Sequence, residues 1–442
     1  MKSMKNFLLF ILLFFILIGI CCGQSDRSCE DLAKEFVNLL VKENFIQAET
    51  CFDSTVKGLM PADKLQGIWK ELLAETGPFK KEARIRKDKK SEYDIIYVTC
   101  EFEKTSLDIQ IVFNNKKEIS GLWFLPPGTS LEYKIPAYVK PDGFTEKEVT
   151  VGSGEWELPG TLTVPKVPGN IPAVILVHGS GPNDRDETVG ANKPFKDIAL
   201  GLASRGIATL RYEKRTKTYG EKMGSMKELT VKEETVDDVL EGLKLLQKTE
   251  GIDQGKIFIL GHSLGGTLIP KIAVLTPDAA GFIILAGATL PLEDKILEQT
   301  NYIYSLDGKI SDEEQIKLDE IKRIVEKIKV LNENSPDELL YGVYPKYWLD
   351  LRAYNILNTA KQVKQPLLIL QGERDYQVTL EDFKLWKSAL AGQKNVEFKT
   401  YPLLNHLFIE GEGKSSPDEY MQGGNIPEYI IKDISDWIKK VK

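Results

Sequence analysis

The sequence predicts an α/β protein with a mostly parallel sheet flanked by helices and a helical cap insertion, preceded by a small α+β domain. From about residue 146, short runs rich in Val, Ile and Leu alternate with helical segments, which is typical of a parallel sheet buried on both faces. Residues 24–125 give helices first and antiparallel strands afterwards, the order expected of an α+β domain. A long helical segment at residues 291–362 separates two sheet strands, and insertions of this length are usually functional.

Composition places the chain among soluble globular proteins and argues against nucleic acid as a partner. The 442 residues are 42% hydrophobic and 28% charged, which is ordinary for a folded protein of two or three domains. The 58 Lys+Arg residues against 65 Asp+Glu residues give a formal net charge of −7, and no concentrated basic tract offers a nucleic-acid surface.

Residues 1–23 have the pattern of a secretory signal peptide. Two lysines precede an uninterrupted apolar run of 14 residues at 7–20, and small residues follow it. The run is short for a bilayer span, so we expect export through a signal peptide, to the periplasm, cell surface or medium. Cys21 and Cys22 raise a lipoprotein alternative, although the residue before them fits that pattern poorly. Membrane contact is then expected only through an uncleaved or lipidated leader.

Residues 24–125 are predicted to form the small α+β domain, and residues 126–145, punctuated by Pro and Gly, the linker after it. The segments at 29–40 and 63–73 place apolar residues at helical spacing. Residues 92–125 are rich in β-branched and aromatic residues, with NNKK as a hairpin signal. The mature chain has three cysteines, which allow at most one intramolecular disulfide. They are Cys29, Cys51 and Cys100.

Residues 146–442 are predicted to form the larger domain. It opens with an antiparallel hairpin at 146–165 and then alternates strands with helices, which include 194–206 and 235–248. The strands that follow the hairpin are expected at residues 173–179, 208–213, 256–262, 281–287, 366–372 and 396–402.

The insertion at residues 291–362 is interpreted as a cap over a site. Its first part includes a charged helix at 311–331, whose charges are expected to form a solvated face. Its second part is aromatic, and these rings suit either an apolar acyl or aryl group or the packing of the cap onto the body. The rings are Tyr341, Tyr344, Tyr347 and Trp348.

The stretch ILGHSLGGT contains a candidate nucleophile, Ser263. An apolar strand precedes it and a helical segment follows, in which Pro270 is expected to kink or shorten the helix. Strand, tight turn and helix make the setting that a nucleophile elbow requires. Gly261 and Gly265 lack a Cβ, so the strand and the helix can approach closely while the serine adopts a strained backbone.

A nucleophilic serine needs a base, and the chain has three histidines. His178 ends a strand and is expected to hold its loop by hydrogen bonding. His262 directly precedes the serine and is expected to point away across the turn. His406 follows the last predicted strand, and the order serine, acid, histidine along the chain selects it as the base.

The acid that orients the base should follow a strand between the serine and the histidine. Asp375 does so after the strand PLLIL and a glycine-containing turn, and it is the predicted acid. Glu373 lies two residues away and is its competitor. A third carboxylate, Asp350, lies in the insertion and on no predicted sheet strand.

Two backbone N–H groups are expected to stabilise the oxyanion of a tetrahedral intermediate. One belongs to Leu264, directly after the nucleophile, and the other to Ser180 in the loop HGSGP, with Gly181 as its neighbour. The charged run NDRDE that follows this loop carries no functional prediction, since a solvated polar loop accounts for it.

As an ordered set, these motifs resemble the α/β-hydrolase superfamily. Residues 146–442 are most similar to a bacterial exported carboxylesterase branch, often labelled serine aminopeptidase-like, through GEWELPGTLTVP, HGSGPNDRDE, LRYEKR, GHSLGG, GERD and NH. Residues 28–125 resemble the small α+β domain found ahead of such hydrolases in some exported bacterial proteins. The resemblance implies the α/β-hydrolase fold and a carboxylesterase with an acyl-enzyme intermediate, with Ser263, Asp375 and His406 at the triad positions.

The sequence therefore predicts a serine hydrolase that cleaves small-molecule carboxylic esters without a metal or an organic cofactor. One alternative is an aminopeptidase or dipeptidyl-type serine peptidase on the same triad, which would need a charged anchor for a peptide terminus. Another is a non-catalytic ligand-binding protein, against which a complete triad in the expected order argues.

Overall fold

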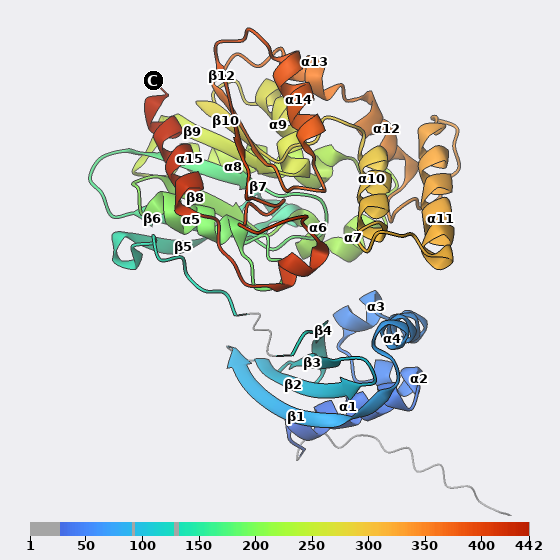
Figure 1. Cartoon of the computed structure of the whole chain (residues 1–442). Helices are drawn as coiled ribbons and strands as arrows, with labels where there is room; N and C mark the ends of the chain where they lie inside the picture. Colours follow the sequence, from blue (N-terminus) through green and yellow to red (C-terminus); the bar gives the residue numbers. More distant parts are fainter. Residues whose placement is uncertain (1–26, 91–92, 128–131, 442) are drawn as a thin grey trace, which may run out of the picture. The chain divides into compact units, whose positions relative to one another are not determined.

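The computed structural model describes residues 27–90, 93–127 and 132–441, which fall into two compact units divided between Thr129 and Ser130 (Figure 1). The predicted signal peptide at residues 1–23 lies outside the described residues, so the export that it implies stays a prediction. Within these three ranges, no helix is both long enough and apolar enough to cross a membrane.

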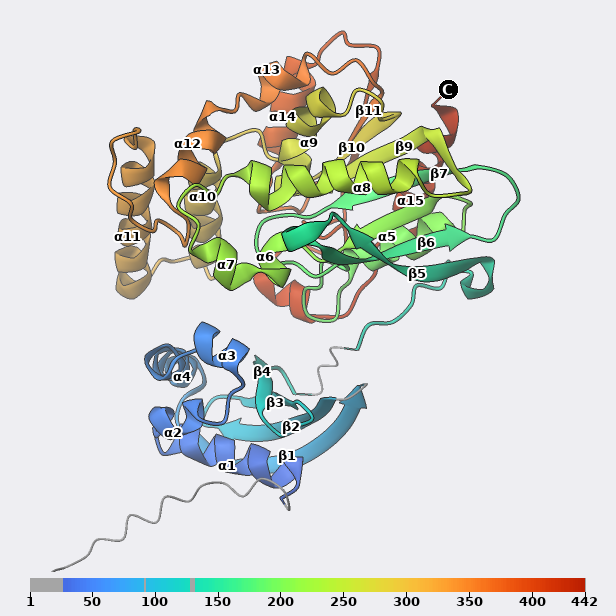
Figure 2. The ribbon, with the colours of Figure 1, turned by 180° about the vertical axis from the view of Figure 1, so that it is seen from behind.

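The N-terminal unit packs helices against an antiparallel sheet whose four strands pair in chain order (Figure 2). Its core includes Phe36 and Trp69 from the helices and Ile96 and Ile111 from the sheet. All three described cysteines are free thiols. The elements are α1 (Cys29–Val41), α2 (Phe45–Glu49), α3 (Ser54–Leu59), α4 (Ala62–Thr76), β1 (Phe79–Lys90), β2 (Tyr93–Phe102), β3 (Ser106–Phe113) and β4 (Ile119–Leu125).

Strand β1 is absent from the sequence prediction, which placed the first strand of this domain after residue 91. The segment FKKEARIRKDKK lacks the apolar alternation of a half-buried strand. It pairs on one side only, with β2, and most of its side chains are exposed. Lysines and arginines on such an edge strand discourage pairing with other chains, so its composition fits an edge.

The C-terminal unit is built on an eight-stranded sheet with the order β12-β11-β10-β9-β7-β8-β6-β5. The hairpin β5–β6 is antiparallel, and β6 pairs antiparallel with β8. From β8 to β12 all neighbours are parallel, as the apolar runs predict. The strands are β5 (Phe144–Val151), β6 (Leu158–Pro165), β7 (Ile171–Val177), β8 (Ala208–Tyr212), β9 (Ile252–His262), β10 (Gly281–Leu285), β11 (Leu367–Gly372) and β12 (Val396–Tyr401).

Helices cover both faces of this sheet, which confirms the predicted fold class (Figures 1 and 2). Along β7, Val174 and Leu176 belong to one core cluster with α5 (Pro194–Ala203) and α15 (Glu428–Lys440). Ile175 and Val177 belong to the other cluster, as the two-residue period of a strand requires. The helices of that second face are α8 (Asp237–Gln247), α9 (Leu264–Leu275) and α14 (Leu380–Ala389).

Helix α9 runs without interruption from Leu264 to Leu275, although Pro270 lies inside it. Of the expected kink or shortening at this proline, the shortening is therefore wrong, and the kink stays a prediction. Most of the helix is buried between the sheet strands and the insertion, and this packing offsets the intrinsic cost of an internal proline, which is about 3 kcal/mol.

The insertion between β10 and β11 is helical throughout most of its length. In α11, Ser311 and Glu314 form a capping box, and the outer face is exposed, as its charge predicts. Trp348 and Ile328 belong to a small apolar core within the insertion. The helices are α10 (Leu292–Tyr304), α11 (Asp312–Lys329), α12 (Pro345–Ala353) and α13 (Ile356–Ala360).

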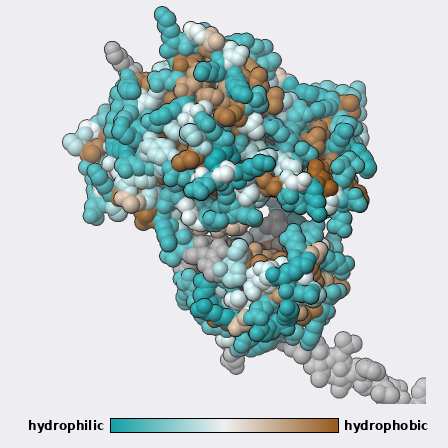
Figure 3. All heavy atoms as spheres, in the orientation of Figure 1, coloured by the Kyte–Doolittle hydropathy of each residue, from teal (hydrophilic) through white to brown (hydrophobic). Residues whose placement is uncertain are grey.

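The surface seen in Figure 3 is largely hydrophilic, with apolar residues in small groups. Such scattered apolar residues are normal on a soluble protein. A further group of apolar side chains lies inside the protein, where the insertion meets the carboxyl edge of the sheet.

Candidate active site

Ser263 occupies the sharp turn between β9 and α9. Its φ of 53° and ψ of −118° lie in a region that costs a non-glycine residue about 1–3 kcal/mol. Its N–H donates to the Leu285 carbonyl of the neighbouring strand at 2.9 Å. The two flanking glycines are obligatory here, because a Cβ on Gly261 would lie 2.3 Å from the Gly265 carbonyl oxygen and one on Gly265 would lie 2.3 Å from that of Val177. The predicted strand, turn and helix are thus all present.

His406 and Asp375 meet at the ends of the neighbouring strands β11 and β12. The Nδ1 atom of His406 lies 2.7 Å from Oδ2 of Asp375, and both residues are buried. The other oxygen of Asp375 accepts from the N–H groups of Gln377 and Val378 at 2.8 and 2.9 Å. This carboxylate is therefore held by its own loop while it contacts the imidazole.

The two competing carboxylates lie elsewhere. Glu373 is exposed and accepts a hydrogen bond from the Thr400 hydroxyl at 2.7 Å. Asp350 lies on α12 and pairs with Lys271 of α9 at 3.0 Å. Of the three candidate acids, the structure brings Asp375 to His406.

The loop that follows β7 lies directly against the serine. A Cβ on Gly179 would come within 3.0 Å of the Ser263 Cβ and within 3.5 Å of its Oγ. Ser180 and Leu264, the two predicted oxyanion donors, line the same cavity as Ser263. Leu264 opens α9, so its N–H has no carbonyl partner within the helix, and the positive end of the helix dipole favours negative charge beside it.

A buried ion pair, missed by the sequence reasoning, stands behind this loop. Glu187 accepts from the Gly179 N–H at 2.6 Å, and its second oxygen lies 2.9 Å from Nδ1 of His262. The Nε2 atom of His262 lies 2.9 Å from the His406 carbonyl oxygen, to which it donates. One ion pair thus links the loop after β7 to the loop that carries His406.

The pKa values of this pair shift toward its charged form. Burial alone would lower the pKa of His262, but the Glu187 carboxylate outweighs burial and raises it. Burial alone would raise the pKa of Glu187, but His262 and the Gly179 N–H lower it. The Glu187 carboxylate therefore favours the protonated form of the His262 ring.

Two expectations about this region need correction. The run NDRDE is not solvated throughout, because Asp186 and Glu187 are buried. Asp186 pairs with Arg211 and Lys193, and charged residues are buried only where they are paired. His262 does not point clear of the site either, since its ring centroid lies 4.8 Å from that of His406. The local sequence does not predict these contacts, because the partners, such as Asp186 and Arg211 or Glu187 and His262, lie far apart along the chain.

His178, the remaining histidine, is a packed and neutral ring. It is 1% exposed and lies against Phe195 and Tyr212, with ring centroids 5.1 and 5.3 Å apart. Burial lowers its pKa to about 4. Ring packing holds its loop together with a hydrogen bond to the Asp184 backbone, as the sequence suggests.

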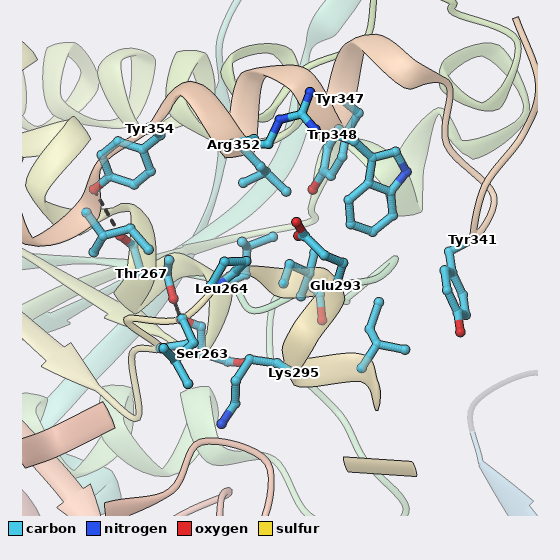
Figure 4. Close-up of a pocket in the computed structure, with 18 of the residues that line it drawn as sticks. Ser263, Leu264, Thr267, Glu293, Lys295, Tyr341, Tyr347, Trp348, Arg352 and Tyr354 are labelled. Carbon is cyan, nitrogen blue, oxygen red and sulfur yellow. Dashed lines mark hydrogen bonds between the residues drawn. The ribbon is translucent and has the colours of Figure 1, made fainter. Parts of the chain in front are cut away.

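A cavity of about 660 Å³ lies between the insertion and the sheet edge, and Ser263 is at its base (Figure 4). The body contributes Ser180, Leu264 and Thr267, and the insertion covers them with aromatic and aliphatic side chains. These chains are Ile296, Tyr341, Val343, Tyr347, Trp348, Leu351, Tyr354, Ile356 and Leu357.

The predicted aromatic residues divide between the two roles considered for them. Tyr341, Tyr347 and Trp348 line the cavity, and Tyr347 and Trp348 are also buried anchors of the insertion. The Trp348 indole N–H donates to the Leu340 carbonyl at 3.1 Å. Tyr354 ties α12 to α9 through a 3.0 Å hydrogen bond to the Thr267 carbonyl (Figure 4).

Within the described residues, the insertion contributes one acidic side chain to the cavity lining, and the body contributes Glu234. Glu293 on α10 is 4% exposed and lines the cavity, and its carboxylate is directed toward Tyr347 and Trp348 (Figure 4). Lys295, on the same helix, points away and binds Asp382 at 2.9 Å instead. Over the described ranges, no side chain makes a hydrogen bond or salt bridge to the Glu293 carboxylate. Glu293 is not predicted from the sequence, because the insertion's charges are expected there to form a solvated face.

The fold and this site define an α/β-hydrolase. Comparison with known families gives two matches: residues 172–412 match the family described as serine aminopeptidase, S33, and residues 33–122 match a family of unknown function, DUF3887.

A curated relative is esterase EstD of Thermotoga maritima, 40% identical over 405 residues, which cover 92% of this chain and 94% of that protein. Among solved structures, Est1E of Butyrivibrio proteoclasticus is 18% identical with a TM-score of 0.44, over 66% of this chain and 99% of the other. The Pyrococcus furiosus esterase Pf2001 is 16% identical with a TM-score of 0.43, over 70% and 96%.

The chain belongs to the serine aminopeptidase S33 family of the α/β-hydrolase superfamily. It is an enzyme with an esterase as a homologue along nearly its whole length. The interpretation as a non-catalytic binding protein is therefore set aside.

Proposed function

We propose that this enzyme is a carboxylesterase that cleaves small carboxylic esters through an acyl-enzyme intermediate. The observation that carries the proposal is that the His406–Asp375 pair lies beside the turn of the positive-φ Ser263, because the His406 ring centroid is 4.8 Å from that of His262, the residue before the serine. Ser263 acts as the nucleophile, His406 as general base and then general acid, and Asp375 as the group that orients the imidazole.

The hydrogen bond between His406 and Asp375 determines which imidazole nitrogen can act on the serine. Asp375 holds Nδ1 of His406, so Nε2 is the nitrogen that removes the proton from the Ser263 hydroxyl. The serine oxygen attacks the ester carbonyl, and the N–H groups of Ser180 and Leu264 stabilise the oxyanion. His406 returns the proton to the leaving alcohol, and a water molecule then releases the carboxylic acid by the same steps in reverse order.

The cavity supports a small substrate with an apolar acyl or aryl part. Its volume of about 660 Å³ lies within the range typical of small-molecule sites. Rings and aliphatic chains of the insertion surround the space above Ser263, so the partner that we propose is a small-molecule ester.

A second candidate is an aminopeptidase on the same triad, and one observation favours it. A peptide terminus needs a charged anchor, and the buried Glu293 carboxylate inside the cavity offers one for an ammonium group. Neighbouring aromatic rings also attract cations. The two candidates therefore differ in whether the substrate carries a positive charge.

A direct test uses the purified full chain with p-nitrophenyl esters of increasing acyl length and with aminoacyl p-nitroanilides. We expect ester hydrolysis that Ser263→Ala reduces by several orders of magnitude, while the matched exposed variant Ser225→Ala retains it. Ester turnover that survives Ser263→Ala would sink the mechanism. Cleavage of the anilides without cleavage of the esters would establish the peptidase instead.

Export remains part of the proposal, because residues 1–23 carry a signal-peptide pattern. Fractionation of cells that produce the full chain should find the enzyme outside the cytoplasm, shortened by its leader. A full-length chain in the cytoplasmic fraction would contradict this.

A further inference from the structure

A buried lysine contacts the loop after β7, which contains Gly179 and Ser180. Nζ of Lys214, which lies just after β8, donates to the Gly179 carbonyl oxygen at 2.7 Å. The Asn183 side-chain amide donates to the same oxygen at 3.1 Å. Lys214 is 2% exposed, so its contact with this carbonyl is shielded from water, where electrostatic interactions are stronger than on the surface.

The carbonyl that Lys214 binds and the proposed oxyanion donor belong to one peptide group. The Gly179 C=O and the Ser180 N–H share the planar unit that joins the two residues, and in a trans peptide they point in opposite directions. A cation on the carbonyl oxygen therefore fixes the direction of the Ser180 N–H and increases the positive charge on its hydrogen. The lysine acts on the oxyanion without touching the substrate.

The same lysine is connected to the cap through a carboxylate. Its Nζ donates to one oxygen of Glu234 at 2.6 Å, and the Tyr347 hydroxyl donates to the other oxygen at 2.5 Å. All three side chains are buried. Glu234 lies in a π-helical turn, Lys232–Val236, a rare element that is frequent at functional sites.

The connection joins two parts that are distant in sequence. Tyr347 lies on α12 of the insertion and lines the cavity, as does Glu234. A buried ion pair adds little to stability over an apolar replacement, so stability alone does not account for a lysine and a glutamate at these positions. Lys214 contacts the Gly179 carbonyl and Glu234. Glu234 in turn contacts Lys214 and Tyr347.

We propose that Lys214 is a positioning residue for the oxyanion hole, and that Tyr347 couples the seating of the cap to it through Glu234. This inference rests on the proposed function, because it acts through the Ser180 N–H as an oxyanion donor. When the cap is seated, Tyr347 holds Glu234, Glu234 holds the lysine, and the lysine holds the Gly179–Ser180 peptide in its productive orientation.

Lys214→Met tests the inference because it keeps the length and removes the charge. Loss of a direct oxyanion donor typically costs 10²- to 10³-fold in kcat, and Asn183 still contacts the carbonyl, so we expect a decrease of roughly 10- to 100-fold with KM nearly unchanged. The matched control is Lys271→Met, which breaks the lysine–carboxylate pair between α9 and α12 but leaves the Gly179 carbonyl untouched.

Inhibitors distinguish positioning of the oxyanion hole from a general structural effect. A trifluoromethyl ketone forms a tetrahedral oxyanion on the serine, whereas the corresponding methyl ketone binds as a planar carbonyl. Lys214→Met should weaken the trifluoromethyl ketone by about the factor lost in kcat and change the methyl ketone less than about threefold. Equal weakening of both inhibitors, or an unchanged kcat, would overturn the inference.

Tyr347→Phe provides an independent variant, since it removes only the hydroxyl. We expect it to lower kcat by roughly 3- to 10-fold, the size of one buried hydrogen bond, with the same selectivity between the two ketones. If Lys214→Met does not fold, this variant decides, and unchanged selectivity in it would overturn the inference. Wild-type protein without ester or anilide turnover would overturn the proposed function and this inference with it, whereas an active wild type with unaltered variants would overturn the inference alone.

Discussion

The ion pair between Glu187 and His262 allows a prediction whose size and pH dependence both follow from the structure. Glu187→Gln keeps an oxygen for the Gly179 N–H, and its amide can donate to Nδ1 of a neutral His262, so we expect a cost of about 1 kcal/mol. Glu187→Ala leaves a buried imidazolium without its partner, which costs about 3–5 kcal/mol. At about 2 °C per kcal/mol for a large unit, the melting temperature should fall by roughly 2 °C and 6–10 °C respectively.

The pH dependence has a defined sign. The pKa of His262 is raised above its ordinary value of 6.5, so its contribution is full below pH 6.5 and is lost as the pH rises through the folded-state pKa. The pKa of Glu187 is lowered from its ordinary 4.5, so its contribution is full above pH 4.5 and is lost as the pH falls through the folded-state pKa. The pair therefore stabilises the fold most between these two values.

The assay is the melting temperature of the wild type, Glu187→Gln and Glu187→Ala from about pH 4 to about pH 9, with the exposed Glu373→Gln as control. The difference between the wild type and Glu187→Gln should be largest between pH 4.5 and 6.5 and shrink at higher pH. A difference that stays constant over the whole range, or that the control reproduces, would refute the assignment of a charged pair.

Three further predictions concern the site. Asp375→Asn should lower kcat by about 10⁴-fold in ester assays while Glu373→Gln stays within about twofold, and the reverse order would return Glu373 to candidacy as the acid. Glu293→Gln should reduce the ratio of kcat/KM for an amino ester to that for the matching uncharged ester by roughly 10-fold or more; an unchanged ratio would remove the argument for the peptidase. Gly265→Ala should abolish activity and destabilise the fold by several kcal/mol, because its Cβ would lie 2.3 Å from the Val177 oxygen, and a stable, active variant measured by thermal unfolding would contradict the geometry of the turn.

The sequence predicted those features that depend on local pattern. Strands β2 to β12 were predicted from apolar runs, which either alternate with polar residues at every second position or are continuous. The turn at Ser263 was predicted from glycines at fixed offsets from the serine. The triad could be predicted because the chain has only three histidines and because Asp375 and His406 each follow a predicted strand. The carboxyl ends of parallel strands lie at one edge of a sheet, so residues that follow them are brought together. The strand and turn signals lie within a few residues of the features that they predict.

The features that the sequence did not predict depend on partners far away in the chain. The edge strand β1 is charged because an edge faces water, so it carries no apolar signal. Glu187, Lys214 and Glu234 are ordinary charged residues until the fold buries them against His262, Gly179 and Tyr347. Glu293 differs from the solvated glutamates of the insertion only by the side of the helix on which it lies.

The central claim is that Ser263 becomes acylated during turnover. Rapid mixing of the wild-type chain with excess p-nitrophenyl acetate, followed by acid quenching and mass spectrometry of the peptides, measures this directly. We expect a burst of about one equivalent of p-nitrophenolate per active chain and an acetyl group on the peptide that contains Ser263. An acetyl group on a different residue, with Ser263 unmodified at full turnover, would contradict the account.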